Sequence, residues 1–308
     1  MLRLDAGATR EALPWAALLE EVATVCREQV AGLIFCPTRL VVPLGEAGTL
    51  LVMPAVSREL SITKLVTVHA GNAGLGLPTI QGEVVVMDTR SGQRLMQLDG
   101  PTLTARRTAA VSLLAARLLG AADAQSALLI GTGAQALAHA EALAALMPLA
   151  RLHVQGRSVA ASKAFAGQLH LMGIQAQALT PEQQASLPWD LIITATTSAT
   201  PVLADAGAQD ALVIAVGAYR HDMAELPPAL VQRAALFVDD PDGARAEAGD
   251  LLQAGVDWEQ VLGLEHLVQD PAAAPQQGAR VFKSVGCARW DLAAARVAAH
   301  HNPGPSGA

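Results

Sequence analysis

The hydrophobic positions in the first third of the chain predict one helix followed by several short strands. Between residues 10 and 30 the apolar side chains recur at helical spacing, with glutamates on the other side. Short runs of β-type residues follow, separated by turn signals such as Gly71-Asn72 and Ser91-Gly92. These predicted strands are residues 39–42, 48–53, 65–69 and 83–88. The pattern therefore predicts an α+β unit built on a strand-rich sheet.

The pattern changes to alternating strand and helix after residue 126. A helix is predicted over residues 103–119, with Gly120 placed to end it. Beyond it the predicted strands are residues 127–130, 152–155, 174–178, 191–195, 212–216 and 236–238, with helices over 134–146 and 160–171. Repeated β-α alternation needs right-handed crossovers and predicts a doubly wound parallel sheet. The fold class is therefore α/β, a Rossmann domain accompanied by an α+β domain.

Composition and charge exclude several classes of function. The chain has 308 residues, 52% of them hydrophobic and 16% charged, so it has ample material for a core. A formal charge of −7 argues against a nucleic-acid partner but not against an anionic substrate, which local cations would bind. The apolar runs are too short to cross a membrane, and the first residues contain no apolar signal core. Cys26, Cys36 and Cys287 have no disulfide or metal-ligand spacing. We expect a cytoplasmic protein without a metal.

A glycine-rich turn is the first candidate site. Gly131 and Gly133 lie between a predicted buried strand and the helix over 134–146, in the pattern GxGxxA with Ala136 in the third position. Glycines there allow a tight turn and close backbone approach, and the helix N-terminus, with Ala134 and Gln135, then faces a pyrophosphate. Glycines also serve ordinary turns, but here strand, helix and the following βαβ pattern agree. We therefore predict a dinucleotide cofactor.

The residues after the second strand of this domain bear on which cofactor is used. NAD-binding domains carry an acidic residue about 20 residues beyond the glycines, where it binds the ribose. This chain has Arg157 and Ser158 there instead. Because an Arg binds a 2′-phosphate, NADP(H) is the predicted cofactor and NAD(H) the alternative. The competing interpretation is that Arg157 is a solvated loop residue.

Several segments together resemble the ornithine cyclodeaminase/mu-crystallin family. They are KLVTVHAGNAGLGLPTIQGEVVVMDTRSGQRLMQLDGPTLTARRTAA, IGTGAQA, ATTSATPVL, VGAYRHDMAEL and FKSVGCARWDLA, in the family's order over nearly the whole chain. The resemblance implies a substrate-binding and dimerisation domain over residues 1–118, completed by residues 288–308, which contain the C-terminal helix. It also implies an NADP(H)-binding Rossmann domain over 119–287, and a homodimer.

The same resemblance implies a site for the substrate carboxylate. Its cations would be Arg39, Lys64 and Arg107, and Thr79 would add a hydroxyl. Charge-assisted donors, above all the Arg fork, suit a carboxylate. Without the resemblance, exposed surface charges would be the commoner interpretation. Within TARRTAA, spacing favours Arg107 over Arg106.

On the cofactor side, the resemblance implies three further groups of residues. These residues are Thr196, Thr197 and Ser198 after the fourth strand of the domain, Val216 and Gly217 near the nicotinamide, and Ser284 and Gly286 closing over it. For Thr197 and Ser198 the alternative is ordinary helix N-capping.

The chain departs from the cyclodeaminases at one position. They carry an Asp shortly after the fifth strand, where it handles the amino group, and here Tyr219 stands in that place. A tyrosine, with an ordinary pKa of about 10, cannot serve as a carboxylate base near neutral pH. Asp222 lies three residues later and is a poor substitute by register. We expect Tyr219 to line the substrate pocket, and Asp291 and Glu225 to be structural.

These residues favour the ketimine-reductase branch of the family. The hypothesis is NAD(P)H-dependent reduction of Δ1-pyrroline-2-carboxylate to L-proline and of Δ1-piperideine-2-carboxylate to L-pipecolate, with the cations orienting C2 toward the nicotinamide. Lys64 is the first candidate for the proton source, and Tyr219, His221 or water are others. The alternatives are an ornithine cyclodeaminase or amino-acid dehydrogenase of the same fold, and a non-catalytic NADP(H)- or small-ligand-binding protein.

Overall fold

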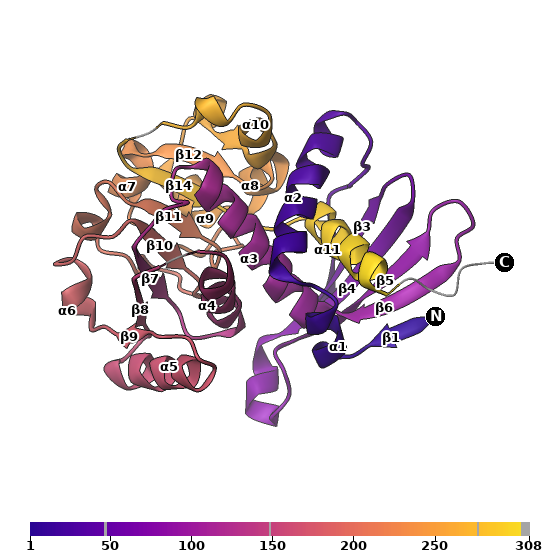
Figure 1. The fold of residues 1–308 in the computed structure, drawn as a ribbon, viewed down its shortest axis with the longest axis horizontal. Coiled ribbons are helices and arrows are strands. Elements are labelled where there is room, and N and C mark those ends of the chain that lie inside the picture. The colour runs from indigo at the N-terminus through magenta and orange to yellow at the C-terminus, as the bar shows by residue number, and fades with distance from the viewer. Residues whose placement is uncertain (46–47, 148, 276, 303–308) are drawn as a thin grey trace. The chain divides into compact units, whose positions relative to one another are not determined.

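The chain forms two compact units, drawn in Figure 1. The structure, a computed structural model, describes residues 1–45, 48–147, 149–275 and 277–302. Unit 1 consists of Met1–Arg107 and Cys287–Ala308, and unit 2 of Thr108–Gly286. The first boundary lies inside helix α3 (Gly100–Leu118), whereas the sequence places it at 118/119, where that helix ends.

Unit 1 is a largely antiparallel sheet with helices on one face. Its sheet has six strands in the described part of the chain, in the order β1-β6-β5-β4-β3-β2, and only β1 pairs parallel. The strands are β1 (Leu2–Leu4), β2 (Leu40–Leu44), β3 (Gly48–Val56), β4 (Leu60–His69), β5 (Ile80–Asp88) and β6 (Arg94–Asp99). The helices are α1 (Ala6–Glu11), α2 (Trp15–Val30), α11 (Ala288–His301) and the 3-10 turn η1 (Ala70–Leu75).

Alternation along the strands explains which face of this sheet is covered. In β4 the buried positions are Ile62, Lys64 and Val66, whereas the residues between them are half-exposed. Helix α11 packs on β3, β4 and β5 and against α2, so it covers the buried side. A period of two sends alternate side chains to opposite faces. Lys64 therefore lies on the helix-covered side of the sheet.

Unit 2 is the parallel sheet that the β-α alternation predicts. Its eight described strands run in the order β13-β12-β14-β11-β10-β7-β8-β9, and every pairing between them is parallel. The strands are β7 (Ser126–Ile130), β8 (Arg151–Gln155), β9 (Gln177–Ala178), β10 (Leu191–Thr194), β11 (Leu212–Ala215), β12 (Ala235–Val238), β13 (Leu262–Gly263) and β14 (Arg280–Lys283). The predicted α/β fold class is confirmed.

Short helices connect these strands. They are α4 (Ala134–Leu146), α5 (Val159–Leu171), α6 (Pro181–Gln184), α7 (Pro228–Arg233), α8 (Pro241–Glu247), α9 (Gly249–Ala254) and α10 (Leu264–Gln269), with 3-10 turns η2 (Asp205–Ala208), η3 (Trp258–Gln260) and η4 (Pro271–Ala273). From β7 the chain crosses to β8 on one side and later to β10 on the other. The strand order therefore reverses between β7 and β10, the place where open α/β sheets bind ligands.

The central strand β14 was not predicted. It lies between β11 and β12, yet its four residues include Arg280 and Lys283. Lys283 is fully buried, and Arg280 donates to the carbonyl oxygens of Leu119 (2.7 Å) and Asp210 (3.1 Å). Two cations in a run of four residues look solvent-exposed by composition, and only tertiary partners make them core residues.

Within the described residues we find neither a membrane-spanning helix nor a cluster of metal ligands. Over these ranges no helix combines the length and apolarity needed to cross a membrane. Nor do His, Cys, Asp and Glu side chains in this part of the chain gather in a group of three that could hold a metal ion.

A buried histidine connects the helix after the glycine turn to α3. His139 of α4 is fully buried, with Nδ1 2.7 Å from the carbonyl oxygen of Gln135 and Nε2 2.9 Å from the hydroxyl of Ser112. A carbonyl only accepts, so Nδ1 carries the proton and Nε2 accepts from Ser112. Burial lowers the pKa of His139 from 6.5 to about 4. The ring is therefore neutral in the folded protein.

This histidine should make the fold sensitive to acid. Because its folded pKa lies below the unfolded value, its contribution to stability is complete above pH 6.5 and is lost as the pH falls through 4. The full difference is about 3 kcal/mol. We expect His139→Gln to flatten the fall in unfolding free energy over this window, measured by denaturant titration. The exposed His170→Gln is the matched control, and parallel curves for wild type and His139→Gln would contradict the assignment.

Candidate functional site

The turn between β7 and α4 has the geometry that a pyrophosphate needs. Gly131 is buried with a φ of +129°, and a Cβ on it would lie 2.4 Å from the carbonyl oxygen of Ala195, beyond β10. Gly133 caps α4 without a side-chain hydrogen bond, and a Cβ there would meet nothing within 4 Å. Ala136 is fully buried. The N-terminus of α4, with Ala134 and Gln135, is therefore open to an anion, and its role in binding a cofactor stays a prediction.

The turn after β8 holds Arg157 and Ser158 at the surface. Both side chains are exposed, and the Ser158 hydroxyl accepts from the backbone N–H of Ala161 (3.2 Å), so it caps α5. Gly156, which the sequence reasoning missed, would bring a Cβ within 2.9 Å of the Ala161 Cβ. This close approach starts α5 immediately after the strand and leaves the Arg157 guanidinium in solvent.

The loops after β10 and β11 lie against each other. A Cβ on Gly217 would lie 1.9 Å from the carbonyl oxygen of Thr196, so only glycine fits. Val216 is buried beside it, and Thr197 is exposed. Ser198 does not cap a helix: its hydroxyl donates to the carbonyl oxygen of Thr200 (2.6 Å) in a turn, and the next described helical turn is η2. The helix N-cap alternative for Thr197 and Ser198 is therefore wrong.

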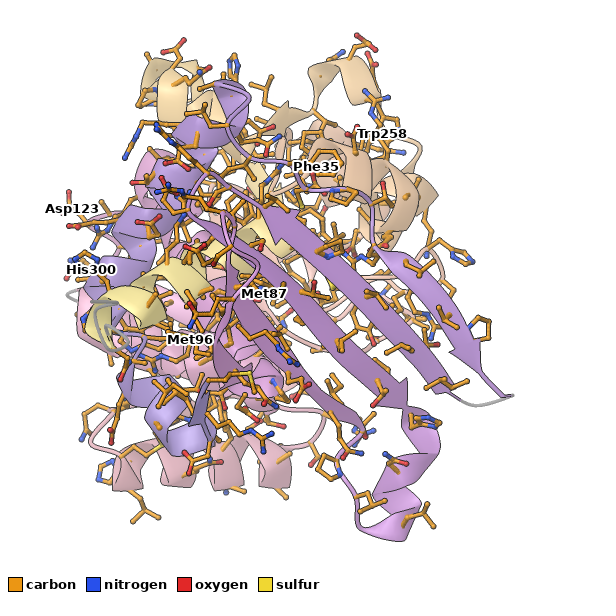
Figure 2. All side chains as sticks on the ribbon, turned by 90° about the vertical axis from the view of Figure 1, so that its right-hand side faces the viewer. Phe35, Met87, Met96, Asp123, Trp258 and His300 are labelled. Atoms are coloured by element: carbon orange, nitrogen blue, oxygen red, sulfur yellow. The ribbon has the colours of Figure 1, made fainter. Side chains whose placement is uncertain are left out.

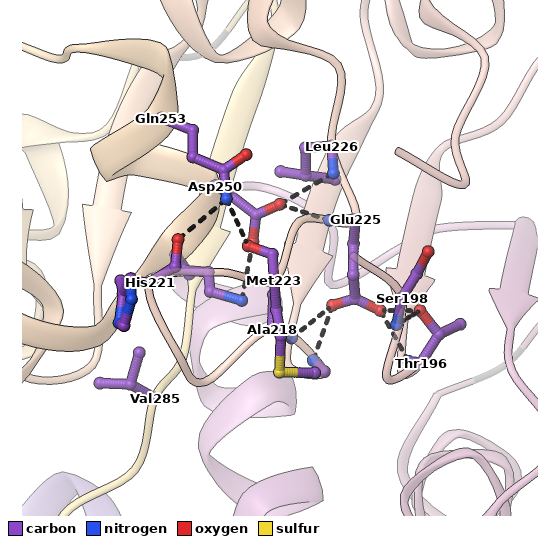
Figure 3. A network of polar contacts seen from close by, with 12 residues as sticks. Thr196, Ser198, Ala218, His221, Met223, Glu225, Leu226, Asp250, Gln253 and Val285 are labelled. Carbon is purple, nitrogen blue, oxygen red and sulfur yellow. Dashed lines mark hydrogen bonds and ion pairs between the residues drawn. The ribbon is translucent and has the colours of Figure 1, made fainter. Parts of the chain in front are cut away.

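Two buried carboxylates, both outside the predicted site, hold the loops at this edge of the sheet. Asp239, which follows β12, accepts from the Ser284 hydroxyl (2.8 Å) and from the backbone N–H of Gly286 (2.9 Å). Gly286 has a φ of +77°. Glu225 accepts from Thr196 and Gly217, and Figure 3 shows these contacts. The expectation that Glu225 is structural is confirmed. No local signal in the sequence distinguishes Asp239 from a surface acid.

Unit 1 contains a buried group of charges. The Lys64 Nζ forms an ion pair with Asp291 Oδ2 at 2.7 Å, and the Arg107 Nε donates to Asp291 Oδ1 at 3.1 Å. Lys64 and Arg107 are 3% and 5% exposed and Asp291 is fully buried, so the surface-charge interpretation is wrong for both cations. Two buried cations share one carboxylate in the described chain, so another anion there would be favourable.

Arg39 acts on the same group. It is half-buried in the segment before β2, and its charge helps to lower the pKa of Lys64. That pKa falls from 10.5 to about 8 chiefly because of burial; Asp291 opposes the change, and Arg107 and Arg39 add to it. Arg106 is held elsewhere, with its Nε on the carbonyl oxygen of Leu13 and its guanidinium over Trp15. Of the two adjacent arginines, Arg107 therefore belongs to the cation group.

The structure does not bring Thr79 to these cations. Thr79 is exposed in the turn before β5, and its carbonyl oxygen accepts from the His69 backbone N–H (2.9 Å). Lys64 pairs with Val84 across the sheet, so Thr79 lies five residues further along that strand. At roughly 3.4 Å per residue this is about 17 Å. Its substrate-binding role stays a prediction.

Tyr219 and Asp222 follow β11 in unit 2. Tyr219 is half-buried. Asp222 is exposed and forms an ion pair with Arg220, whose hydrogen bond holds the pKa of this carboxyl below its usual value. A carboxylate with a lowered pKa is a weaker base. Asp222 is therefore a poor replacement for the missing deaminase Asp.

Comparisons with known proteins agree with these features. The Delta(1)-pyrroline-2-carboxylate/Delta(1)-piperideine-2-carboxylate reductase of Azospirillum brasilense is 46% identical over 296 residues, covering 96% of this chain and 94% of its own. The Thermococcus litoralis Delta(1)-pyrroline-2-carboxylate reductase, solved with NADH and L-proline, matches with a TM-score of 0.88 at 24% identity and covers 100% of both chains. A lysine cyclodeaminase structure matches at 0.83 and 33% identity, covering 94% of this chain and 86% of its own. The family model for the ornithine cyclodeaminase/mu-crystallin family matches residues 5–302, and the chain belongs to that family.

Proposed function

We propose that this protein reduces cyclic ketimine carboxylates with a nicotinamide cofactor. The substrates are Δ1-pyrroline-2-carboxylate, which yields L-proline, and Δ1-piperideine-2-carboxylate, which yields L-pipecolate. The observation that carries the proposal is the buried Lys64–Asp291–Arg107 group in a chain that is 46% identical to a reductase named for both substrates. A carboxylate-binding group and a dinucleotide turn are the parts that this reaction needs.

In this proposal Arg107, Lys64 and Arg39 hold the substrate carboxylate. Asp291 stabilises the two buried cations while no substrate is bound, because a buried cation without a partner is costly. The substrate carboxylate then supplies the second anion. The Arg107 guanidinium is fixed through its Nε, and no other hydrogen bond of its side chain is made to the described residues, so its other N–H groups are proposed to bind the substrate.

Lys64 is the proposed proton source. Its pKa of about 8 keeps it protonated at neutral pH yet makes it a stronger acid than an ordinary lysine. A protonated C=N bond is a better electrophile at C2, so a proton from Nζ would promote reduction. Burial both lowers this pKa and keeps water from competing for the proton.

The residues of unit 2 fit a bound dinucleotide. The open N-terminus of α4 would hold the pyrophosphate, and Arg157 the 2′-phosphate of NADP(H). When bound, the cofactor supplies the reducing equivalents. Thr196, Thr197, Ser198, Val216, Gly217, Ser284 and Gly286 are proposed to surround its nicotinamide end.

We also propose that the protein is a homodimer. The face of the unit 1 sheet opposite α11, turned toward the viewer in Figure 2, bears the half-exposed side chains of Val52, Leu65, Val85 and Met87. Apolar side chains gathered on one face favour burial by a partner. The expected homodimer of this family supports a second copy as that partner, and the mass of the protein in solution tests it.

The purified protein should oxidise NADPH when Δ1-pyrroline-2-carboxylate is added and should form proline in equal amount. The fall in absorbance of the reduced nicotinamide measures the NADPH consumed, and amino-acid analysis measures the proline formed. Ornithine with NAD+ is run in parallel. Release of ammonia and proline from ornithine would instead indicate a cyclodeaminase, and no turnover in any arm would favour another imine or a binding protein.

The rate should fall on the alkaline side of its pH profile if Lys64 must be protonated. We expect kcat/KM to fall above about pH 8, where Nζ loses its proton. Asp291→Asn removes an attraction that raises this pKa, so the alkaline limb should move to lower pH. Glu20→Gln, an equal loss of charge at an exposed site of unit 1, is the control. A limb unmoved by Asp291→Asn would exclude Lys64 as the titrating group.

Cofactor preference should depend on Arg157. Replacing it by Ala removes a charge that would contact only the 2′-phosphate, so KM for NADPH should rise roughly tenfold while KM for NADH changes little. The exposed Arg151→Ala, at the other end of β8, is the matched control. Equal effects of Arg157→Ala on both cofactors would mean that Arg157 does not read the phosphate.

A further inference from the structure

One buried carboxylate joins the two loops proposed to surround the nicotinamide. Glu225 is fully buried and lies in the segment before α7. Its Oε1 accepts from the backbone N–H (2.6 Å) and hydroxyl (2.9 Å) of Thr196, after β10. Its Oε2 accepts from the backbone N–H of Gly217 (2.7 Å) and Ala218 (3.2 Å), after β11. Each oxygen thus serves one loop, as the dashed lines of Figure 3 show.

The loops after β10 and β11 pack closely against each other and against the Glu225 side chain. A Cβ on Gly217 would lie 1.9 Å from the Thr196 carbonyl oxygen and 2.6 Å from Glu225 Oε1. The backbone N–H groups of both loops therefore point into one small space. Four donors converge there, and a carboxylate is the side chain that offers acceptors only. Without it, these buried donors would lose their partners.

A second buried carboxylate, that of Asp250, fixes the backbone at Glu225. Asp250 of α9 accepts at Oδ1 from the backbone N–H of Glu225 (2.6 Å) and of Leu226 (2.9 Å). Its Oδ2 forms an ion pair with Lys283 Nζ at 3.0 Å, and both side chains are fully buried. Lys283 ends β14, the residue before Ser284. The chain Lys283–Asp250–Glu225 therefore links the carboxyl ends of β14, β11 and β10.

We propose that Glu225 is a positioning residue for the nicotinamide end of the cofactor. It acts through the Thr196 and Gly217 loops, and this inference rests on the proposed function in assigning those loops to the cofactor. Among the described hydrogen bonds none joins Glu225 to the glycine turn at Gly131 and Gly133, so we assign its effect to the nicotinamide half of the cofactor site. The side chain therefore controls one half of the cofactor site.

The test compares a whole cofactor with a fragment that lacks the nicotinamide. Glu225→Gln keeps the shape but turns an NH2 donor toward one loop. We expect it to weaken binding of NADPH roughly tenfold and binding of 2′,5′-ADP less than about twofold, measured by calorimetry. NADH and ADP, which both lack the 2′-phosphate, are compared in the same way, so that the test also works if the protein does not bind that phosphate. Glu259→Gln, an exposed glutamate in unit 2, should change neither affinity.

A milder variant covers the case in which Glu225→Gln does not fold. Thr196→Val removes the hydroxyl bond to Oε1 and the long contact in which that hydroxyl accepts from the backbone N–H of Ser198 (3.4 Å). It should weaken binding of NADPH a fewfold and leave binding of the fragment unchanged. An equal loss of affinity for NADPH and for the fragment, or no loss of affinity for either, overturns the proposal. These measurements need no ketimine. If the wild type turns over no ketimine but the variants still lose more affinity for NADPH than for the fragment, only the proposed function is refuted. If the wild type turns over ketimine but the variants show no such difference, only the role of Glu225 is refuted.

Discussion

A charge removed from water must be neutralised or fully hydrogen-bonded, and the buried charge group of each unit depends on this constraint. In unit 1, Asp291 of α11 allows Lys64 and Arg107 to be buried. In unit 2, Glu225 is stable at zero exposure because four donors converge on it. In each case the carboxylate does not face solvent. It holds other groups, so that the residues proposed to bind ligands are fixed by contacts within the protein.

The same constraint distinguishes a reductase from a deaminase of this fold. A deaminase needs a carboxylate placed to take a proton from an amino group, and such a group must keep an accessible lone pair. Here Tyr219 follows β11, Asp222 is paired with Arg220, and both oxygens of Glu225 accept hydrogen bonds from the loops after β10 and β11. The acids near β11 are therefore structural or exposed. What remains suits a substrate that already contains its C=N bond.

Close backbone approach is the second condition for the site. Gly131 and Gly217 each lie so near the chain beyond β10 that a methyl group would collide with a carbonyl oxygen. The approach at Gly131 occurs where the strand order reverses, between β7 and β10. Tight turns at that position bring several strand ends together. The loops can then act as one surface, provided that a carboxylate such as Glu225 links them.

Local sequence determined the alternation of strand and helix, the glycine turn at Gly131, and the start of α4 at Ala134, because periodicity and turn chemistry act over a few residues. Through its family motifs it also identified Arg39, Lys64 and Arg107 as one group. It predicted that Asp291 and Glu225 are structural, but it revealed neither their partners nor β14, since a charged residue resembles a surface residue until its partners are known. Those partners come from strands and helices far apart in the chain. Only the tertiary structure decided which charges are buried, because burial of a charge depends on long-range contacts that no local pattern encodes.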